Sequence, residues 1–207
     1  MRIRQITYFA TDCSEMRMIM DKIILASGSP RRREILSQVG IAYDVIPSNI
    51  EEVITQNTPS LIVEELSKQK AMDVANRNKM AVVLGADTVV ALEDKILGKP
   101  KDEQDAFEMI SALSGRTHFV YTGVTLAKVS QDGSMVSRTF HEKTAVTVSK
   151  MSSEEILAYI ATKEPMDKAG AYGIQGAFAA YISGIEGDYY NVVGLPICRV
   201  MRELKEI

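Results

Sequence analysis

The stretch that most constrains the fold is ILASGSPRRREIL, residues 24–36, in which an apolar run passes directly into a helix. The segment 22–27 is apolar, is followed by Gly and Pro, and predicts a short buried strand. Ser29 and Pro30 are typical of an N-cap and a first helical position, and Gly40 predicts the end of the helix. A buried strand that leads at once into a helix is typical of α/β proteins, in which helices cover the faces of a sheet.

The alternation of strands and helices continues along the chain and then gives way to a hairpin. Thr58 and Pro59 open a second, long helix, and residues 80–92 (MAVVLGADTVVAL) predict a strand that is interrupted at residues 85–87 and then continues. Two β-rich runs flank residues 131–133 (QDG), which is a strong hairpin signal. Further helix starts are expected at Asp102 and at the capping box of Ser152 and Glu155. The pattern predicts an α/β fold with a mixed sheet, and no repeat or linker marks independent domains.

The charge balance excludes a surface built to coat nucleic acid. The 207 residues carry a formal net charge of −3, and the 46% of hydrophobic residues is ordinary for a globular protein. No stretch approaches the length of a transmembrane helix. Cys13 and Cys198 match no metal or redox spacing, which favours a reduced, cytoplasmic compartment. We therefore expect a cytoplasmic protein with no nucleic-acid partner and no membrane partner.

The N-terminal segment, residues 1–19, precedes the first predicted strand. Asp12, Glu15 and Arg17 interrupt the apolar core that a signal peptide needs, so secretion is not expected. We expect residues 1–19 to be a poorly ordered extension or a mis-assigned start, and residues 20–207 to form the functional domain.

Three consecutive arginines, Arg31, Arg32 and Arg33, lie in the first turn of the predicted helix, where the helix dipole disfavours cations. A helix N-terminus that follows a Gly-containing turn presents free backbone N–H groups, which suit a phosphate or a carboxylate. Arginines repel the dipole in an empty site and cooperate with it once a polyanion binds. The alternative is a solvated surface cluster. We expect at least one arginine to bind phosphate, and we assign Arg33 to the surface.

Asp87 is the one charged residue in the apolar run 80–92. A carboxylate in such a run is costly unless it meets a metal, a cation or a proton-transfer task. A functional Asp87 would ligate a divalent ion and orient or deprotonate water, whereas the alternative is an Asx-type turn beside Gly85. Lys70 and Lys99 could each be an ordinary solvated surface cation, and they become site candidates only if they converge with Arg31 and Asp87 on one cleft.

A Gly-rich segment, residues 164–178 (EPMDKAGAYGIQGAF), contains Lys168 and Gln175 between its glycines. Such a loop can approach a ligand closely, and an amide can recognise a base. The alternative is an ordinary turn-rich connection. His118 and His141 have no metal-ligand spacing, so a zinc site of the usual kind is not expected.

Together these stretches resemble the Maf family of nucleotide pyrophosphatases, small cytoplasmic proteins that are also described as septum-formation inhibitors. The similarity runs in the family's order from residue 22 to about residue 200 and covers nearly all the chain except the N-terminal segment. The matching stretches are ILASGSPRRREIL, EE at 51–52, LSKQKA, LGADTVV, LGKPKD, LSGRTH, DKAGAYGIQG and GDYYNVVGLPI. The resemblance implies a single Maf-like (ITPase-like) α/β domain, with a twisted mixed sheet flanked by helices and two lobes around a central cleft.

The resemblance also implies hydrolysis of a nucleoside triphosphate between the α- and β-phosphates, which gives a monophosphate and pyrophosphate. Asp87 is then the proton acceptor that activates water, and Glu52 is its partner in the acidic part of the site. A divalent cation, Mg²⁺, Mn²⁺ or Co²⁺, is implied, held by Asp87, Glu52 and the phosphates rather than by a protein cage. The residues implied to hold the triphosphate are Arg31, Arg32, Lys70 and Lys99.

Substrate choice follows from a comparison of family branches. One branch acts on dTTP and UTP and another on 7-methyl-GTP; Arg31, Thr88 and Gln175 match the first. Ser29 and Lys168 are further candidate substrate contacts. Modified pyrimidine nucleotides are expected as additional substrates, which would make this a house-cleaning enzyme. The family often forms homodimers, so a homodimer is compatible with the resemblance.

Two rival functions stay open. The first is a purine-specific house-cleaning pyrophosphatase with a similar two-lobed fold, against which Arg31 and the GIQG loop argue. The second is a non-catalytic nucleotide-binding regulator of septum formation, which would not need Asp87 and the cations around it. A dual role in cell division would leave no further trace in the sequence.

Overall fold

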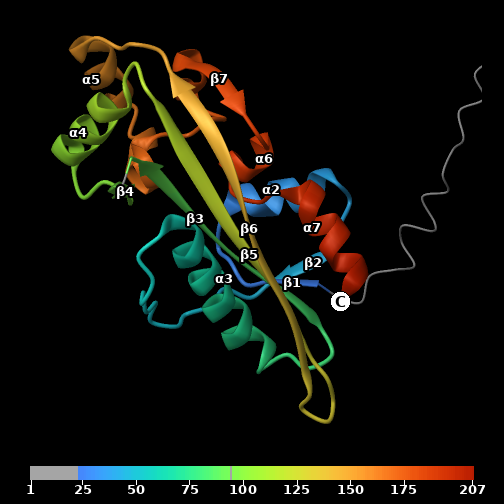
Figure 1. The fold of residues 1–207 in the computed structure, drawn as a ribbon. Coiled ribbons are helices and arrows are strands. Elements are labelled where there is room, and N and C mark those ends of the chain that lie inside the picture. The colour runs from blue at the N-terminus through green and yellow to red at the C-terminus, as the bar shows by residue number, and fades with distance from the viewer. Residues whose placement is uncertain (1–22, 94) are drawn as a thin grey trace, which may run out of the picture.

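A seven-stranded mixed sheet forms the centre of the molecule (Figure 1). The structure, a computed structural model, describes residues 23–93 and 95–207, so the expected N-terminal extension, residues 1–19, lies outside the described residues. The strand order is β2-β1-β3-β5-β6-β7, with β4 paired to β3. β1 is parallel to both of its neighbours and the other pairs are antiparallel, which confirms the predicted mixed sheet. The strands are β1 (Ile23–Leu25), β2 (Tyr43–Val45), β3 (Val82–Leu92), β4 (Lys95–Leu97), β5 (Thr117–Val129), β6 (Met135–Val148) and β7 (Ile182–Glu186).

Helices cover the sheet on both faces. Figure 1 shows α3 on one side and α2, α6 and α7 on the other, while α4 and α5 lie together near β4. The α-helices are α2 (Pro30–Gln38), α3 (Pro59–Ala75), α4 (Glu103–Leu113), α5 (Ser153–Ala161), α6 (Tyr189–Val193) and α7 (Ile197–Glu203). Short 3-10 helices follow α5 and α7: η1 (Glu164–Asp167), η2 (Ala169–Ala171), η3 (Ala177–Tyr181) and η4 (Leu204–Glu206). Among the described residues, none of the helices combines the length and apolar content that crossing a bilayer requires.

Two glycines allow α3 to pack closely on the sheet. A Cβ atom at Gly85 of β3 would lie 2.4 Å from the carbonyl oxygen of Ser67, and one at Gly123 of β5 would lie 2.2 Å from that of Val63. Both distances are far shorter than any real Cβ contact, so the helix backbone rests directly on these two residues. Since side chains alternate between the faces of a strand, Asp87 points to the same side as Gly85 and therefore toward α3.

The predicted interruption of the strand at residues 85–87 is wrong. β3 is continuous from Val82 to Leu92, and Asp87 pairs with Gly123 in the ladder between β3 and β5. The glycine in this strand serves the close approach of α3 rather than a bend, and the Asx-turn alternative for Asp87 falls with the same observation.

The helix starts follow the sequence signals. The Asp102 side chain caps α4, Ser152 and Glu155 form the expected capping box of α5, and the hairpin turn lies at residues 131–133. Ser29 occupies the N-cap position of α2, but its side chain makes no capping hydrogen bond. The predicted N-cap position of Ser29 is therefore confirmed, and its hydroxyl, which does not cap the helix, stays available to a ligand.

Candidate functional site

The site forms where one edge of β3 has no strand beside it. On this side, β1 pairs with β3 only as far as Leu84, and β4 pairs with it only from Val90 onward. Within the described sheet, the intervening residues of β3 have no strand partner on that edge. After β1 the chain turns into α2 instead of continuing along β3. Ligands of open α/β sheets bind at such places, beyond the carboxyl end of a parallel strand.

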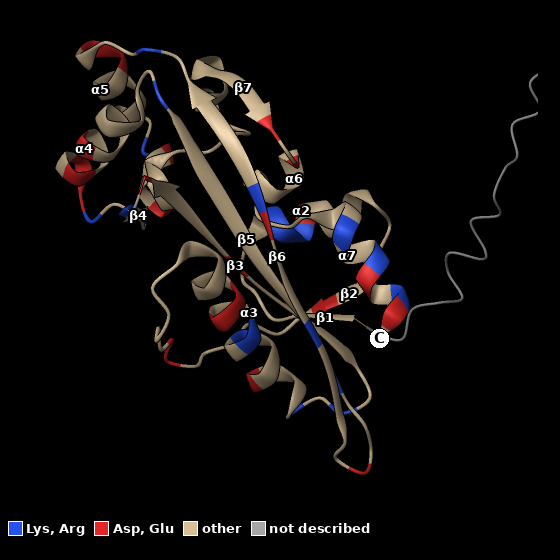
Figure 2. Cartoon of the chain, viewed as in Figure 1, with Lys and Arg blue, Asp and Glu red and all other residues tan. Residues whose placement is uncertain are grey.

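A cleft of about 770 Å³ opens at this edge, between the start of α2 and residues 164–176 of the Gly-rich segment. Its volume falls in the range of small-molecule and cofactor pockets. The Figure 2 view shows basic segments on α2 and on α3, which lie on different sides of the sheet. Of the sequence-predicted site residues, those that line the cleft are Ser29, Arg31, Arg32, Lys70, Asp87, Thr88, Lys99, Lys168 and Gln175.

Glu52 lies outside the cleft lining but joins the site through Lys70. The Lys70 ammonium is 2.6 Å from Asp87 Oδ1 and 2.9 Å from Glu52 Oε1, so one cation bridges the two predicted acidic residues. The side chains of Lys70 and Asp87 are each only 16% exposed, and burial of both partners strengthens their attraction. Lys70 occupies Oδ1 of Asp87, and Oδ2 is the oxygen left for a water molecule or a metal ion.

The loop that carries Glu52 is fastened to α3 by side chains of that helix. The Gln69 amide accepts a hydrogen bond from the backbone N–H of Val53 at 3.0 Å and donates one to its carbonyl at 2.5 Å. Glu65 accepts from both the backbone N–H and the hydroxyl of Thr55. Because Val53 directly follows Glu52, the Gln69 clasp fixes the backbone from which Glu52 reaches Lys70.

Arg32 is buried and is held by oxygens that carry no charge. Its Nε donates to the carbonyl of Gly194 at 2.8 Å, Nη1 donates to Ser27 Oγ at 2.8 Å, and Nη2 donates to Thr88 Oγ1 at 3.1 Å. A guanidinium has five N–H donors, so two are left over. Burial lowers the pKa of Arg32, and the charge of Asp87 opposes that change. A buried, oriented guanidinium in a cleft is a ready anion-binding group.

The other predicted cations differ in their ion pairing and in their exposure to solvent. Arg31 Nη1 lies 3.6 Å from Asp167 Oδ2, a weak pairing between partly exposed groups. Lys168 Nζ donates to the carbonyl of Glu164 at 2.6 Å and to Asp167 Oδ1 at 2.7 Å, so it supports the Gly-rich segment. Lys99 is exposed at the rim of the cleft. Arg33, expected on the surface, is exposed and does not line the cleft.

Thr88 and Gln175 occupy different parts of the cleft. The Thr88 hydroxyl contacts Arg32 and lies 2.9 Å from Thr122 Oγ1, so Thr88 positions the guanidinium. The Gln175 side chain is exposed to the cleft, and no described residue forms a hydrogen bond with its amide.

Sequence reasoning missed several groups that shape the site. Ser27 and the carbonyl of Gly194 hold Arg32, and Asp167 faces Arg31. Ser27 could have been found, since it is the polar last residue of the first predicted strand, residues 22–27. Gly194 lies 162 residues from Arg32 in the chain, and no local pattern reports such a contact.

The donor set fits a divalent cation that arrives with phosphates. No group of three or more His, Cys, Asp or Glu side chains gathers for a metal within residues 23–93 and 95–207. Asp87 and Glu52 nevertheless share one cationic position, which the Lys70 ammonium takes in this structure. Mg²⁺ is commonly bound by one or two carboxylates, with substrate phosphates and water completing its shell. The two acidic residues match that arrangement and not a protein cage.

The sequence profile of a family described as Maf-like protein matches residues 22–207. The chain belongs to the Maf family. A Maf relative from Lachnoclostridium phytofermentans, named dTTP/UTP pyrophosphatase, is 55% identical over 188 residues, which cover 90% of this chain and 95% of the relative. A Bacillus cereus protein of the same name is 53% identical over 90% of this chain and 96% of the relative.

The fold of this Maf protein extends to more distant structures. A HAM1 protein from Coxiella burnetii is similar with a TM-score of 0.52 and 15% identity, over 91% of this chain and 100% of that one. The expected α/β class, with a mixed sheet flanked by helices, is confirmed.

Proposed function

We propose that this Maf protein hydrolyses dTTP and UTP to the nucleoside monophosphate and pyrophosphate, with modified pyrimidine triphosphates as further substrates. The proposal rests on one observation: a candidate general base and an anion-binding group line the same cleft. The base is Asp87, paired with Lys70, and the anion-binding group is the buried Arg32, whose guanidinium has two unused N–H donors. Relatives at 53–55% identity that are named dTTP/UTP pyrophosphatase support the same substrates.

The proposed reaction is an attack of water on the α-phosphorus. A bond forms between the water oxygen and that phosphorus, the bond to the α–β bridging oxygen breaks, and pyrophosphate leaves. Asp87 accepts the proton of the water through Oδ2 while Lys70 holds Oδ1. Arg32 binds phosphate oxygens from a fixed position, with Arg31, Lys70 and Lys99 adding charge and Ser29 a hydroxyl. Positioning and charge neutralisation supply most of the catalysis in such reactions.

Asp87 and Glu52 would hold the divalent cation, Mg²⁺, Mn²⁺ or Co²⁺, together with the phosphates. When bound, the cation neutralises charge on the phosphate oxygens. Lys70 contacts Asp87 Oδ1 and Glu52 Oε1, so Asp87 Oδ2 is the oxygen that stays open to the cation.

Gln175, Arg31 and Thr88 are proposed to set substrate choice. The free amide of Gln175 can donate to and accept from the edge of a pyrimidine base. Arg31 lies at the start of α2 across from Asp167, and Thr88 acts through Arg32. Lys168 supports the segment that carries Gln175. Cytoplasmic location, a homodimer and a domain over residues 20–207 stay predictions, and no observation favours the non-catalytic regulator.

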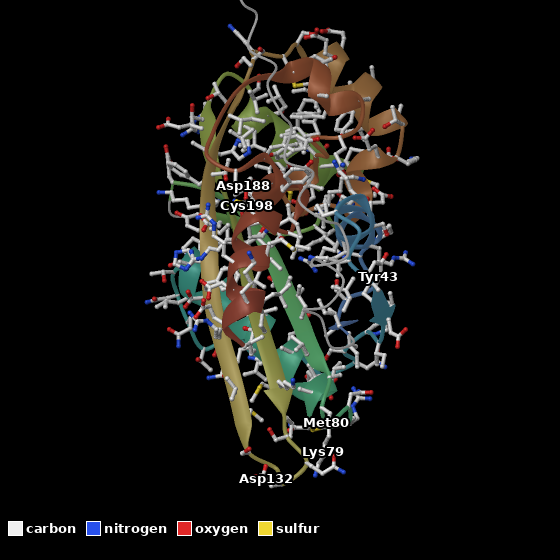
Figure 3. The ribbon with its side chains drawn as sticks, turned by 90° about the vertical axis from the view of Figure 1, so that its right-hand side faces the viewer. Tyr43, Lys79, Met80, Asp132, Asp188 and Cys198 are labelled. Carbon is white, nitrogen blue, oxygen red and sulfur yellow. The ribbon has the colours of Figure 1, made fainter. Side chains whose placement is uncertain are left out.

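The test is a pyrophosphate-release screen over nucleoside triphosphates with Mg²⁺, Mn²⁺ or Co²⁺. We expect turnover of dTTP and UTP that falls by about 100-fold or more in Asp87→Asn, as loss of a catalytic base can cost. Asp132→Asn is the matched control, because Asp132 lies at the tip of the β5–β6 hairpin (Figure 3) and does not line the cleft. Equal turnover by Asp87→Asn and wild type would remove Asp87 from the mechanism, and no turnover of any nucleotide would favour the regulator.

Substrate choice is tested by Gln175→Ala in the same screen. The variant should lose discrimination between pyrimidine and purine triphosphates more than it loses turnover. An unchanged substrate profile would remove Gln175 from the specificity residues.

A further inference from the structure

Gln175 lies in a β-turn that two other residues hold at both ends. The turn spans residues 173–176, closed by a hydrogen bond from the Gly176 N–H to the Gly173 carbonyl at 3.2 Å. We call these four residues the recognition turn. Ile174 is buried and Gln175 is exposed to the cleft, so the turn anchors one central residue and presents the other.

The two ends of the recognition turn are bound by one hydrogen-bonded pair. The Tyr159 hydroxyl, from α5, donates to Glu164 Oε1 at 2.9 Å and accepts from the Gly173 N–H at 3.2 Å. Glu164 Oε2 accepts from the N–H of Ala177, the residue after the turn, at 2.9 Å. The Glu164 carboxylate therefore connects α5 to the far end of a turn thirteen residues later in the chain.

The glycines of the turn make room for this carboxylate. A Cβ atom at Gly176 would lie 2.0 Å from Glu164 Oε1, and one at Gly173 would lie 2.7 Å from Lys168 Cε. The sequence pattern alone predicts that these glycines let a ligand approach closely. In the structure they let Glu164 and Lys168 approach the turn.

Other contacts make the arrangement stiff. Tyr159 packs on Phe178, and Phe178 packs on Tyr172, whose side chain also lines the cleft. Burial and the neighbouring Glu164 carboxylate raise the pKa of Tyr159, so its hydroxyl stays protonated and able to donate. The recognition turn is thus held from behind by aromatic rings and at its ends by the Tyr159–Glu164 pair.

We propose that Glu164 is a positioning residue that determines base selectivity by fixing the recognition turn, and with it the Gln175 amide, toward the nucleobase. This inference rests on the proposed function, in which Gln175 reads the base. Glu164 lines the cleft, but both of its carboxylate oxygens are engaged, by the Tyr159 hydroxyl and the Ala177 N–H. Its loss should therefore alter discrimination between bases more than the rate of the chemical step.

The first test measures kcat and KM for dTTP, UTP and dGTP in wild type, Glu164→Ala and Gln175→Ala. We expect Glu164→Ala to lower the ratio of kcat/KM for dTTP over dGTP by about 10-fold, mainly through KM, as lost hydrogen-bond readout can cost. A variant that combines Glu164→Ala with Gln175→Ala should lose no more selectivity than Gln175→Ala alone, because both changes act through the same amide. Equal loss for all nucleotides, or independent losses in the double variant, would overturn the inference.

Two further variants keep the test informative. Tyr159→Phe removes the hydroxyl that donates to Glu164 but keeps the ring, and it should shift the dTTP/dGTP ratio in the same direction as Glu164→Ala. It replaces Glu164→Ala in the test if that variant does not fold. Glu103→Ala is the matched control, because this exposed carboxylate pairs with Lys163, next to Glu164, without touching the turn. It should leave the ratio unchanged. A shift like that of Glu164→Ala would mean that losing any nearby negative charge is enough to alter base selectivity, and it would overturn the inference.

A readout that does not need turnover separates the two proposals. Amide hydrogen exchange of residues 173–178 should speed up in Glu164→Ala and not in Glu103→Ala. If wild type releases no pyrophosphate from any nucleotide, the proposed function fails, and selectivity is then read from calorimetric binding of dTTP and dGTP. Faster exchange with unchanged selectivity would overturn the inference alone.

Discussion

Lys70 Nζ lies 2.6 Å from Asp87 Oδ1, and this pair joins α3 to the free edge of β3. The contact exists because Gly85, two residues before Asp87, lets the helix backbone rest on the strand. One close packing contact thus places both the candidate base and the cation that orients it. The same ammonium holds Glu52, so the geometry of the acidic part of the site depends on Lys70.

Lys70→Met should lower kcat for dTTP by about 100-fold, since the variant leaves Asp87 and Glu52 unoriented and mutually repelling. Steady-state kinetics with Mg²⁺ would measure the change. Lys68→Met, an exposed lysine on the same helix, serves as the control and should keep wild-type rates. Similar kinetics in the two variants would show that the ion pair has no part in turnover.

The clasp between Gln69 and Val53 leads to a prediction about the metal. Gln69→Ala should raise the Mg²⁺ concentration needed for half-maximal activity by about 10-fold, as loss of a group that orients a ligand typically does. A Mg²⁺ titration at saturating dTTP would measure it. Gln104→Ala on α4, whose amide contacts only Glu108 among the described residues, should leave the titration unchanged. An unaltered Mg²⁺ requirement in Gln69→Ala would separate the loop from metal binding.

Arg32→Lys tests geometry at constant charge. An ammonium cannot satisfy Ser27, Thr88 and Gly194 together from the place of the guanidinium, so the fixed fork toward phosphate is lost. We expect KM for dTTP to rise by about 10-fold or more. Arg33→Lys, the adjacent exposed position, should have wild-type KM. If Arg32→Lys binds dTTP normally, charge alone explains the role of Arg32.

Much of the fold could be predicted because it depends on local signals. The N-caps at Asp102 and Ser152, the hairpin at residues 131–133 and the helix after Pro30 are each written in a few neighbouring residues. The predicted interruption of β3 at residues 85–87 is wrong because that prediction also rests on a local signal, the glycine at position 85. A local pattern cannot tell a glycine that bends a strand from one that admits a helix, and the second case needs α3 in place.

For the site as well, the sequence predicts the functional side chains but not the distant residues that hold them. Residue types and the family resemblance pointed to Asp87, Lys70, Arg32 and Gln175, and all four line one cleft. The partners that hold those side chains were not predictable, because a carbonyl or carboxylate far along the chain has no signature of its own. Glu164 is the clearest example, since its role depends on where Ala177 lies in space.

Gly123→Ala should destabilise the protein, since the added methyl group would meet the Val63 carbonyl at 2.2 Å. We expect a loss of roughly 1–3 kcal/mol in the free energy of unfolding, the usual cost of overpacking. Urea unfolding would measure it. Gly184→Ala is the control, because its Cβ would meet nothing closer than Thr147 at 3.8 Å. Equal stability of the two variants would mean that α3 can move away from β5 at little cost.

His118 makes the stability of the fold depend on pH. It is fully buried on β5, its Nε2 lies 2.7 Å from the Tyr172 hydroxyl, and burial lowers its pKa to about 4. A histidine in the unfolded state has a pKa near 6.5. Between that pH and about pH 4, the unfolded state therefore binds a proton at His118 that the folded state does not bind. Stability from this group is therefore constant above pH 6.5 and is lost as the pH falls toward 4.

Between pH 7 and pH 4.5 the predicted loss is roughly 2 kcal/mol of unfolding free energy, at 1.36 kcal/mol for each pKa unit. His118→Gln removes the titrating group and should lose less stability than wild type over the same interval by about that amount. The difference between the two proteins isolates His118 from the carboxylates that also titrate near pH 4. Urea unfolding at both pH values measures it, and parallel pH profiles for wild type and variant would contradict a neutral, desolvated His118.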